Sequence, residues 1–337
     1  MAFTITVTDS LTAFPCAAND TITRAALRAG VALPYECNTG ACGSCKVELI
    51  SGDIASLRPD ATALSDRDRA KGRVLGCQAQ PRADCVIKVR VDPAAPALPR
   101  PAEQVATLAG ARDLTRDIRE FDFALAAPAG FLPGQYALLR LPGVPTVRAY
   151  SMSNIAGGRL WQFQVKRVPG GQATGVLFDR LAVGDQITLD GPFGHAYLRD
   201  DAPRDIVCIA GGSGISPMLS IARGLAECAP LSGRHLHFFY GGRAPSDICG
   251  EDVLRTLPQL QGRCTYVPVV SAMETTAPRP WSGRTGLVHD AVADAMGAGL
   301  AEFEFYFAGP PPMTLAVQRM LLQAKVPLSQ AHFDQFF

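Results

Sequence analysis

Apolar and polar residues alternate in short runs along the first third of the chain. A period of two is typical of half-buried β-strands and predicts the first strand at residues 3–8. A helix is expected at 21–29, because Asp20 is a good N-cap residue and Gly30 can end the last turn. Residues 1–92 are therefore expected to form a small α+β domain. Its other expected elements are strands at 11–16, 46–50 and 85–91 and a capped helical turn at 64–69.

The middle of the chain has a different rhythm, in which short apolar runs are separated by glycine and proline. Several short strands with turn residues between them are typical of a small antiparallel β-barrel. We expect this barrel within residues 102–202, with strands at 120–125, 136–141, 160–165 and 186–189.

The last third begins with a continuous apolar run at 206–210, which is typical of a buried strand in a parallel sheet. A glycine-rich turn and an amphipathic stretch at 219–227 follow directly. Strand, glycine turn and helix in this order can place a pyrophosphate at a helix N-terminus. Residues 203–337 are therefore expected to form a nucleotide-binding α/β domain. Its other expected elements are strands at 235–240, 264–270 and 303–308 and a helix at 314–323.

A segment rich in proline and alanine, residues 93–101, separates the first domain from the barrel. Such a segment favours extended geometry and acts as a semi-rigid spacer. The length of 337 residues fits two or three domains at about 100–200 residues each. The expected fold class is multidomain α+β and α/β, with domains at 1–92, 102–202 and 203–337 joined by the linker.

The composition is that of an ordinary globular protein, with 47% hydrophobic and 19% charged residues. A net charge of +1 gives no reason to expect nucleic acid or a membrane surface as a partner. The N-terminus has no basic region followed by an apolar run, and no stretch approaches the roughly 18 apolar residues of a membrane span. We therefore expect a cytoplasmic protein, and we expect its five histidines to be structural.

Three cysteines lie close together in residues 35–45 with the spacing C-x4-C-x2-C, and a fourth follows in V-L-G-C-Q. This is the ligand spacing of a plant-type [2Fe-2S] cluster. Gly40 and Gly43 lie between the ligands and provide backbone freedom for the tight loop. A structural zinc site fits less well, because only Cys42 and Cys45 form a close pair, and a disulfide framework is not expected without a secretion signal. The expected ligands are Cys37, Cys42, Cys45 and Cys77, and the other six cysteines are expected to be buried reduced thiols.

Strands around one helix, with a metal loop at one edge, resemble the β-grasp ferredoxin fold. Four acidic residues lie near the ligands in the sequence: Glu36, Asp60, Asp66 and Asp68. They are expected to form a solvated face or, as the alternative, a docking patch for an electron acceptor.

Residues 148–151 read R-A-Y-S and match R-x-Y-S, the flavin fingerprint of the ferredoxin–NAD(P) reductase superfamily, which the barrel segment resembles. The resemblance implies FAD, with Arg148 on the pyrophosphate. It also implies that Tyr150 stacks on the isoalloxazine ring and that Ser151 lies near flavin N5, where the hydride arrives.

A second part of the resemblance lies in the run at 165–174, which leads into a glycine loop and a hydroxyl residue at a helix N-terminus. Gly171 and Thr174 are thereby expected to place donors on the pyrophosphate. Residues 191–194 resemble the G-P-x-G turn at the end of the family's barrel. The flavin contacts implied in this run are Val165, Lys166, Val168, Gly171, Gln172 and Thr174.

In the last domain, the turn at 211–218 resembles the superfamily's G-G-S/T-G-x-x-P form, and 240–243 match Y-G-x-R. Where the family commonly has cysteine beside the nicotinamide, this chain has Ala308. The C-terminal Phe336, two residues after Asp334, is expected to cover the flavin face, with Phe337 as a second candidate. The implied nicotinamide-dinucleotide contacts are Gly211, Gly212, Ser213, Gly214, Arg243, Asp247, Gly309, Pro310 and Met313.

The order of the three domains resembles the reductase components of bacterial multicomponent oxygenases, such as those for carbazole and benzoate. The resemblance implies that NADH reduces FAD and that single electrons pass through the [2Fe-2S] cluster to a Rieske or di-iron oxygenase component, or to an intermediary ferredoxin. NADH is preferred over NADPH, because no Lys or Arg follows Arg243 in residues 244–252. The alternatives are a reductase of deoxysugar synthesis with the same architecture and a non-enzymatic iron–sulfur carrier.

Overall fold

A computed structural model describes residues 1–8, 10, 12–92, 96–272 and 281–336. The chain divides into two compact units, one of residues 1–104, 137–149 and 188–193 and one of the remaining residues, 105–136, 150–187 and 194–337. No helix in the described part of the chain is long and apolar enough to cross a membrane.

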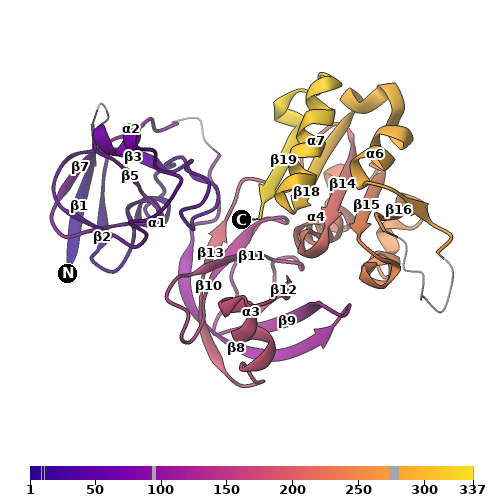
Figure 1. The fold of residues 1–337 in the computed structure, drawn as a ribbon, viewed down its shortest axis with the longest axis horizontal. Helices are drawn as coiled ribbons and strands as arrows, with labels where there is room; N and C mark the ends of the chain where they lie inside the picture. The colour runs from indigo at the N-terminus through magenta and orange to yellow at the C-terminus, as the bar shows by residue number, and fades with distance from the viewer. Residues whose placement is uncertain (9, 11, 93–95, 273–280, 337) are drawn as a thin grey trace. The chain divides into compact units, whose positions relative to one another are not determined.

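The N-terminal residues form a five-stranded sheet of order β2-β1-β7-β3-β5 with helix α1 beside it (Figure 1). Strand β1 pairs antiparallel with β2 and parallel with β7, and apolar residues of these strands and of α1 share one core. The expected small α+β domain is confirmed. Its strands are β1 (Ala2–Val7), β2 (Ala13–Ala17), β3 (Lys46–Ser51), β4 (Ile54–Ser56), β5 (Arg73–Leu75), β6 (Ala79–Pro81) and β7 (Cys85–Lys88), and its helices are α1 (Ile22–Arg28) and α2 (Asp66–Ala70).

The helix ends differ in one detail from the expectation. Thr21, not Asp20, is the N-cap of α1, because the Asp20 carboxylate accepts the Thr21 N–H at 2.8 Å instead of capping the helix. Gly30 does end the helix, with a φ of 81° that favours glycine. Ser65 caps α2 in a reciprocal capping box, as the sequence predicted. The strand expected at 85–91 already ends at Lys88.

The flavin-fingerprint region forms a six-stranded antiparallel sheet of order β11-β10-β13-β8-β9-β12, which is the expected barrel. Alternate residues of its strands point inward, and Phe123 and Phe163 meet edge to face with ring centroids 6.0 Å apart. The sequence did not reveal β8 and β11. The elements are β8 (Ala102–Asp113), β9 (Ile118–Leu125), β10 (Tyr136–Arg140), β11 (Arg148–Ser151), β12 (Leu160–Lys166), β13 (Gln186–Phe193) and α3 (Gln172–Asp179).

The C-terminal domain is a six-stranded parallel sheet of order β17-β16-β15-β14-β18-β19, flanked by helices (Figure 1). Alternate residues of β14 enter two cores: Ile206 and Cys208 pack with α4, whereas Val207 and Ile209 pack with α6 and α7. This confirms the buried central strand. The strands are β14 (Asp205–Gly211), β15 (Leu236–Gly242), β16 (Cys264–Val270), β17 (Arg284–Thr285), β18 (Phe303–Gly309) and β19 (Ala331–Gln335). The helices are α4 (Ile215–Glu227), α5 (Glu251–Arg255), α6 (Val288–Met296) and α7 (Pro311–Gln323), with 3₁₀ turns η1 (Gly212–Gly214), η2 (Ala229–Leu231), η3 (Pro245–Asp247), η4 (Pro258–Leu260), η5 (Gly297–Glu302) and η6 (Leu328–Gln330).

All ten cysteines are free thiols in the structure. Of the six outside the C-x4-C-x2-C set, Cys16, Cys85 and Cys208 are buried. The other three, Cys228, Cys249 and Cys264, are only partly buried, so the expectation of six buried thiols holds for half of them.

Candidate functional site

The loop between α1 and β3 carries three of the four expected cluster ligands in a tight backbone. Asn38, Gly40 and Gly43 all have positive φ, at 54°, 82° and 81°. Two of these positions are glycines, which adopt this region without strain. A Cβ on Gly40 would also lie 2.9 Å from Gln78 Cγ, so the loop has no room for a side chain there.

The four cysteine sulfurs form two pairs. Cys45 Sγ lies 3.1 Å from Cys77 Sγ in the interior, and the Cys42 thiol hydrogen-bonds to Cys37 at the half-buried side. The Cys37 sulfur also accepts the amide N–H groups of Thr39 and Cys42 at 3.5 and 3.4 Å. The Cys42 thiol and these N–H donors lower the pKa of Cys37, whereas the hydrogen bond to Cys37 and burial raise the pKa of Cys42.

This donor set fits a [2Fe-2S] cluster, in which each iron takes two thiolates. Within the described ranges, no group of three or more His, Cys, Asp or Glu side chains is arranged around a single metal ion. Among the histidines, His332 pairs with buried Glu304 at 2.7 Å.

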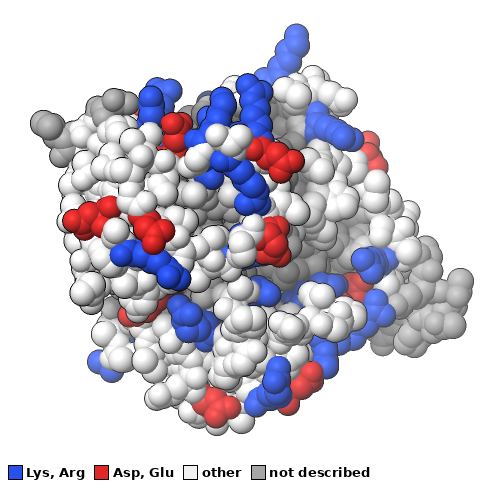
Figure 2. Space-filling view, turned by 60° about the vertical axis from the view of Figure 1, so that its left-hand side comes forward, with Lys and Arg blue, Asp and Glu red and all other residues white. Residues whose placement is uncertain are grey.

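Asp68 does not belong to a docking patch. Its carboxylate is buried, closes the capping box of α2 and pairs with Lys46 at 2.8 Å and Arg73 at 2.9 Å. These contacts lower the pKa of Asp68. The other three acidic residues of the proposed patch are exposed, and Figure 2 shows basic and acidic side chains interspersed on one face of the molecule.

Strand β11 presents the residues of the flavin fingerprint. Arg148 and Tyr150 lie on the same face of the strand because they are two residues apart, and both are half-buried. Arg148 Nη1 donates to the carbonyls of Thr146 and Val147, each at 3.2 Å. Ser151 lies on the opposite face and is buried. An arginine and an aromatic side by side fit the pyrophosphate and ring of a flavin.

Helix α3 begins directly after the glycine loop, with Gly171 as its N-cap. The Thr174 hydroxyl accepts the Val168 N–H and donates to the Val168 carbonyl, both at 3.2 Å. The Thr174 hydroxyl thereby closes the turn, and its donation to a pyrophosphate stays a prediction. A Cβ on Gly171 would lie 2.7 Å from this hydroxyl, so the turn closes only around glycine.

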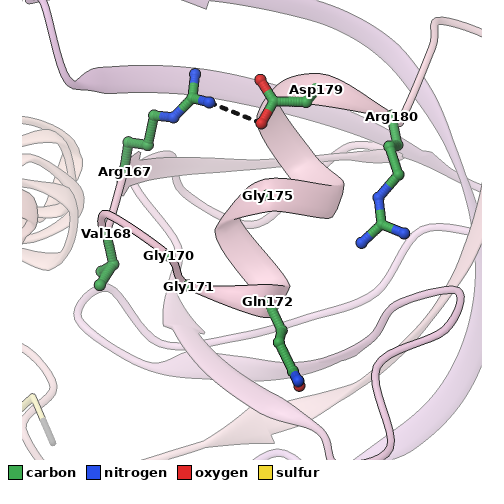
Figure 3. Close-up of a pocket in the computed structure, with 8 residues that line it drawn as sticks. All are labelled: Arg167, Val168, Gly170, Gly171, Gln172, Gly175, Asp179 and Arg180. Carbon is green, nitrogen blue, oxygen red and sulfur yellow. Dashed lines mark hydrogen bonds and ion pairs between the residues drawn. The ribbon is translucent and has the colours of Figure 1, made fainter.

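A cavity of about 360 Å³ lies beside α3 (Figure 3). Exposed Gln172 points away from the helix at its N-terminal end, and Arg167 pairs with Asp179 at 2.7 Å across the cavity rim. The unpartnered amides of a first helical turn, beside basic side chains, fit a phosphate. The cavity is lined by Arg167, Val168, Gly170, Gly171, Gln172, Gly175, Asp179 and Arg180.

The glycine turn after β14 meets the end of β18 at very short range. A Cβ on Gly214 would lie 1.9 Å from the Ala308 carbonyl oxygen, and one on Gly211 would lie 2.6 Å from Met313 Sδ. Gly309 has a φ of 155° and also lies against Met313 and Gly211. The expected residues of the two turns are thus brought together at the carboxyl edge of the parallel sheet, where dinucleotides bind.

Three polar residues on one face of α4 bind strand β11, which we call the flavin strand, and the residues that directly follow it. The sequence did not reveal them. We call Ser216, Ser220 and Arg223 the polar stripe of α4; their spacing of four and three residues places them on one face. The Ser216 hydroxyl is 2% exposed, donates to the Ser151 carbonyl at 2.7 Å and accepts the Gln164 N–H at 3.1 Å.

The other two members of the stripe bind the same stretch of backbone. Ser220 donates to the Asn154 carbonyl at 2.6 Å, and Arg223 donates to the Ser153 carbonyl at 2.6 Å. Burial lowers the pKa of Arg223. The only sequence signal was two serines and an arginine at helical spacing in an otherwise apolar helix.

The loop after β15 carries Arg243 and Asp247. Arg243 is exposed, whereas Asp247 is buried. One Asp247 oxygen accepts the N–H groups of Arg243 and Ala244, and the other pairs with Arg116 at 3.1 Å. Asp247 therefore shapes the loop that carries Arg243, and its place near the adenosine ribose stays a prediction. Arg116 is a basic neighbour that the sequence did not reveal.

Two further expected residues lie at the glycine turns. The Lys166 ammonium group pairs with Asp117 at 2.8 Å. The Lys166 side chain also passes close to Gly212, because a Cβ on that glycine would lie 3.3 Å from Lys166 Cδ. Strand β19 places the Phe336 N–H 3.5 Å from the Gly309 carbonyl, and Phe336 packs partly buried against the core around Ile215 and Ala308. Phe337 lies outside the described residues.

Three family models match the chain in succession. They are a 2Fe-2S iron-sulfur cluster binding domain at residues 5–82, an oxidoreductase FAD-binding domain at 105–197 and an oxidoreductase NAD-binding domain at 208–319.

Curated relatives cover nearly the whole chain. The chain is 39% identical to ferredoxin–NAD(P)(+) reductase CarAd of Metapseudomonas resinovorans, over 96% of each protein. It is 38% identical to the ferredoxin–NAD(+) reductase component of the alkene monooxygenase system of Xanthobacter autotrophicus, over 96% of this chain and 97% of the relative. Among solved structures, the ferredoxin reductase in carbazole 1,9a-dioxygenase matches with a TM-score of 0.89 at 34% identity, covering 100% of this chain and 99% of that one.

Proposed function

Because the chain belongs to the ferredoxin–NAD(P) reductase components of oxygenase systems, we propose that it oxidises NADH in the cytoplasm and delivers single electrons to a partner. The partner is a Rieske or di-iron oxygenase component, or an intermediary ferredoxin. The observation that carries the proposal is the 2.7 Å hydrogen bond from Ser216 to the Ser151 carbonyl, which joins the glycine turn of the nucleotide domain to the flavin strand.

When bound, FAD accepts a hydride from NADH and the [2Fe-2S] cluster carries one electron at a time. The residues of this chain bind and orient these groups. Arg148 holds the flavin pyrophosphate, Tyr150 stacks on the ring and Ser151 lies near N5. The first turn of α3 at Gly171 and Gln172 supports the phosphate end, and the four cysteines hold the cluster.

The nucleotide turns align the donor. Gly211 and Gly214 let the turn pack directly against Met313 and the Ala308 carbonyl. This close packing fixes the start of α4, where the dinucleotide pyrophosphate binds. Phe336 covers the flavin face until the nicotinamide takes its place. No protein side chain acts as a general base, because hydride transfer between the two cofactors requires none.

NADH is favoured over NADPH by charge. A 2′-phosphate requires unpaired basic residues near the adenosine ribose. Residues 244–252 contain no Lys or Arg, and the charge of Arg116 is matched by Asp247 at 3.1 Å. Arg243 then contacts the ribose hydroxyls and is the one basic side chain of this loop that extends into solvent.

Anaerobic NADH titration of the holoprotein tests the proposal. We expect flavin bleaching, the electron paramagnetic resonance signal of a reduced [2Fe-2S] cluster and NADH-dependent reduction of cytochrome c, with NADPH much slower at equal concentration. A protein that contains two irons and one flavin and yet fails to reduce any one-electron acceptor with NADH contradicts the proposal. A single zinc ion in place of iron contradicts the cluster itself.

A further inference from the structure

Arg24, on helix α1, is a buried cation with almost no partners. Arg24 is 4% exposed, and the one hydrogen bond that it donates to a described residue runs from Nη2 to the Asn38 carbonyl at 3.1 Å. Its Nε has no hydrogen-bond partner among the described residues. A buried guanidinium is costly unless it is paired, so this arrangement calls for a counter-charge.

The nearby carboxylates are bound by another arginine. Asp20 and Asp190 both act electrostatically on Arg24, but each pairs with Arg28, at 3.6 and 2.9 Å. Burial raises the pKa values of both carboxyl groups, which weakens them further as counter-ions. Within the described part of the chain, no carboxylate lies within ion-pair distance of Arg24.

The side chain of Arg24 reaches the backbone of the cysteine loop. Its acceptor, Asn38, directly follows Cys37, and the same carbonyl also accepts Gln78 Nε2 at 3.2 Å. That Gln78 nitrogen lies 3.4 Å from Cys77 Sγ. The Arg24 guanidinium is therefore connected to a ligand sulfur by three successive hydrogen bonds, through the Asn38 carbonyl and the Gln78 amide, both of which are buried.

We propose that Arg24 is the internal counter-ion of the iron–sulfur cluster and raises its reduction potential. The inference rests on the [2Fe-2S] site of the proposed function. Four thiolates outweigh the positive charge of the iron–sulfide core, and accepting one electron makes the whole more negative. A fixed positive charge in a dry environment stabilises the reduced form more than the oxidised form. Arg24 thereby favours electron transfer from the reduced flavin to the cluster.

Potentiometric titration of the holoprotein, followed by the electron paramagnetic resonance signal, tests the role of charge. We expect Arg24→Gln to lower the equilibrium constant for cluster reduction by about ten-fold, equivalent to about 59 mV for one electron. Arg24→Lys keeps the charge and should stay within about two-fold of wild type by the same conversion. Lys88→Gln is the control, since it removes an exposed positive charge from the same domain, where water and salt screen its effect; it should leave the potential unchanged.

An unchanged potential in Arg24→Gln, or an equal shift in Arg24→Lys, overturns the inference, because the charge would then not be the cause. Should Arg24→Gln lose iron, Arg24→Met replaces it, since an apolar side chain leaves no buried polar group unpaired. Failure of the inference leaves NADH-dependent cytochrome c reduction intact, whereas failure of the proposed function removes the cluster or that activity.

Discussion

At the scale of single residues, Asp247 shows how one carboxylate can set the choice of dinucleotide. It neutralises Arg116 and fixes the loop that presents Arg243. We predict that Asp247→Asn raises the ratio of NADPH to NADH activity by about ten-fold, because the amide oxygen still accepts the loop N–H groups while Arg116 loses its counter-charge. Steady-state kcat/KM for both dinucleotides measures this ratio.

The matched control for this prediction is Asp252→Asn, which removes an exposed carboxylate from the nearby first turn of α5. It should leave the ratio within two-fold, by the small worth of exposed charges. An Asp247→Asn protein with normal flavin content and an unaltered ratio would show that Asp247 does not govern the choice.

Residues with a fixed backbone requirement were predictable from the sequence. The local sequence patterns around Cys37, Gly40 and Gly214 already predict a tight turn at each position. The structure shows that Gly214 has no room for a side chain, because a Cβ there would lie 1.9 Å from the Ala308 carbonyl oxygen. The ion pair of Arg116 was not predictable, because its partner Asp247 lies 131 residues away in the sequence. A residue type does not reveal such a partner until the fold is known.

At the scale of elements, the strands with strong apolar runs were predicted closely, and β16 was predicted with its observed ends. Strand β11 was missed because R-A-Y-S has no alternation of its own and pairs only within the completed sheet. Strand β19 was missed for a similar reason, since it joins the sheet by parallel pairing with β18. Tertiary pairing, not local propensity, forms both.

The polar stripe of α4 gives the prediction that belongs to this scale. Removing the hydroxyls of Ser216 and Ser220 together eliminates the bonds that they donate to the Ser151 and Asn154 carbonyls. It also eliminates the bonds that they accept from the Gln164 and Gly134 N–H groups, so four hydrogen bonds between α4 and the barrel domain are lost. We predict that the double alanine variant reduces flavin with saturating NADH about ten-fold more slowly, because misplacing the donor raises the barrier to hydride transfer. Stopped-flow bleaching of the flavin measures this rate.

Two comparisons separate positioning from general destabilisation. Ser232→Ala removes an exposed hydroxyl in the same domain and should not change the rate. Ser216→Thr, combined with Ser220→Ala, keeps the hydroxyl at position 216 and should retain most of the wild-type rate of flavin reduction. A double variant that binds flavin normally and reduces it at the wild-type rate would refute the positioning role of the stripe.

At the scale of the whole molecule, separate domains match the models for cluster, flavin and nicotinamide-dinucleotide binding. We therefore expect that the cluster can be removed without loss of hydride transfer to the flavin. The cysteine pairs lie in the first unit, and the hydrogen bonds between the nucleotide turn and the flavin strand lie in the second. Loss of the cluster should therefore spare hydride transfer and remove only the delivery of single electrons. The half-reaction expected to survive is the reduction of the flavin by NADH.

Cys77→Ala tests this separation, since it removes a fully buried ligand sulfur. We predict that the variant loses its iron, keeps most NADH-dependent reduction of ferricyanide at the flavin and falls about ten-fold or more in cytochrome c reduction, because only the flavin remains to pass electrons. Cys16→Ala is the matched control: it removes an equally buried thiol of the same domain, whose pKa burial raises to about 12. It should keep iron and both activities. Loss of both activities in Cys77→Ala with flavin still bound would show that hydride transfer depends on the cluster, which contradicts the prediction.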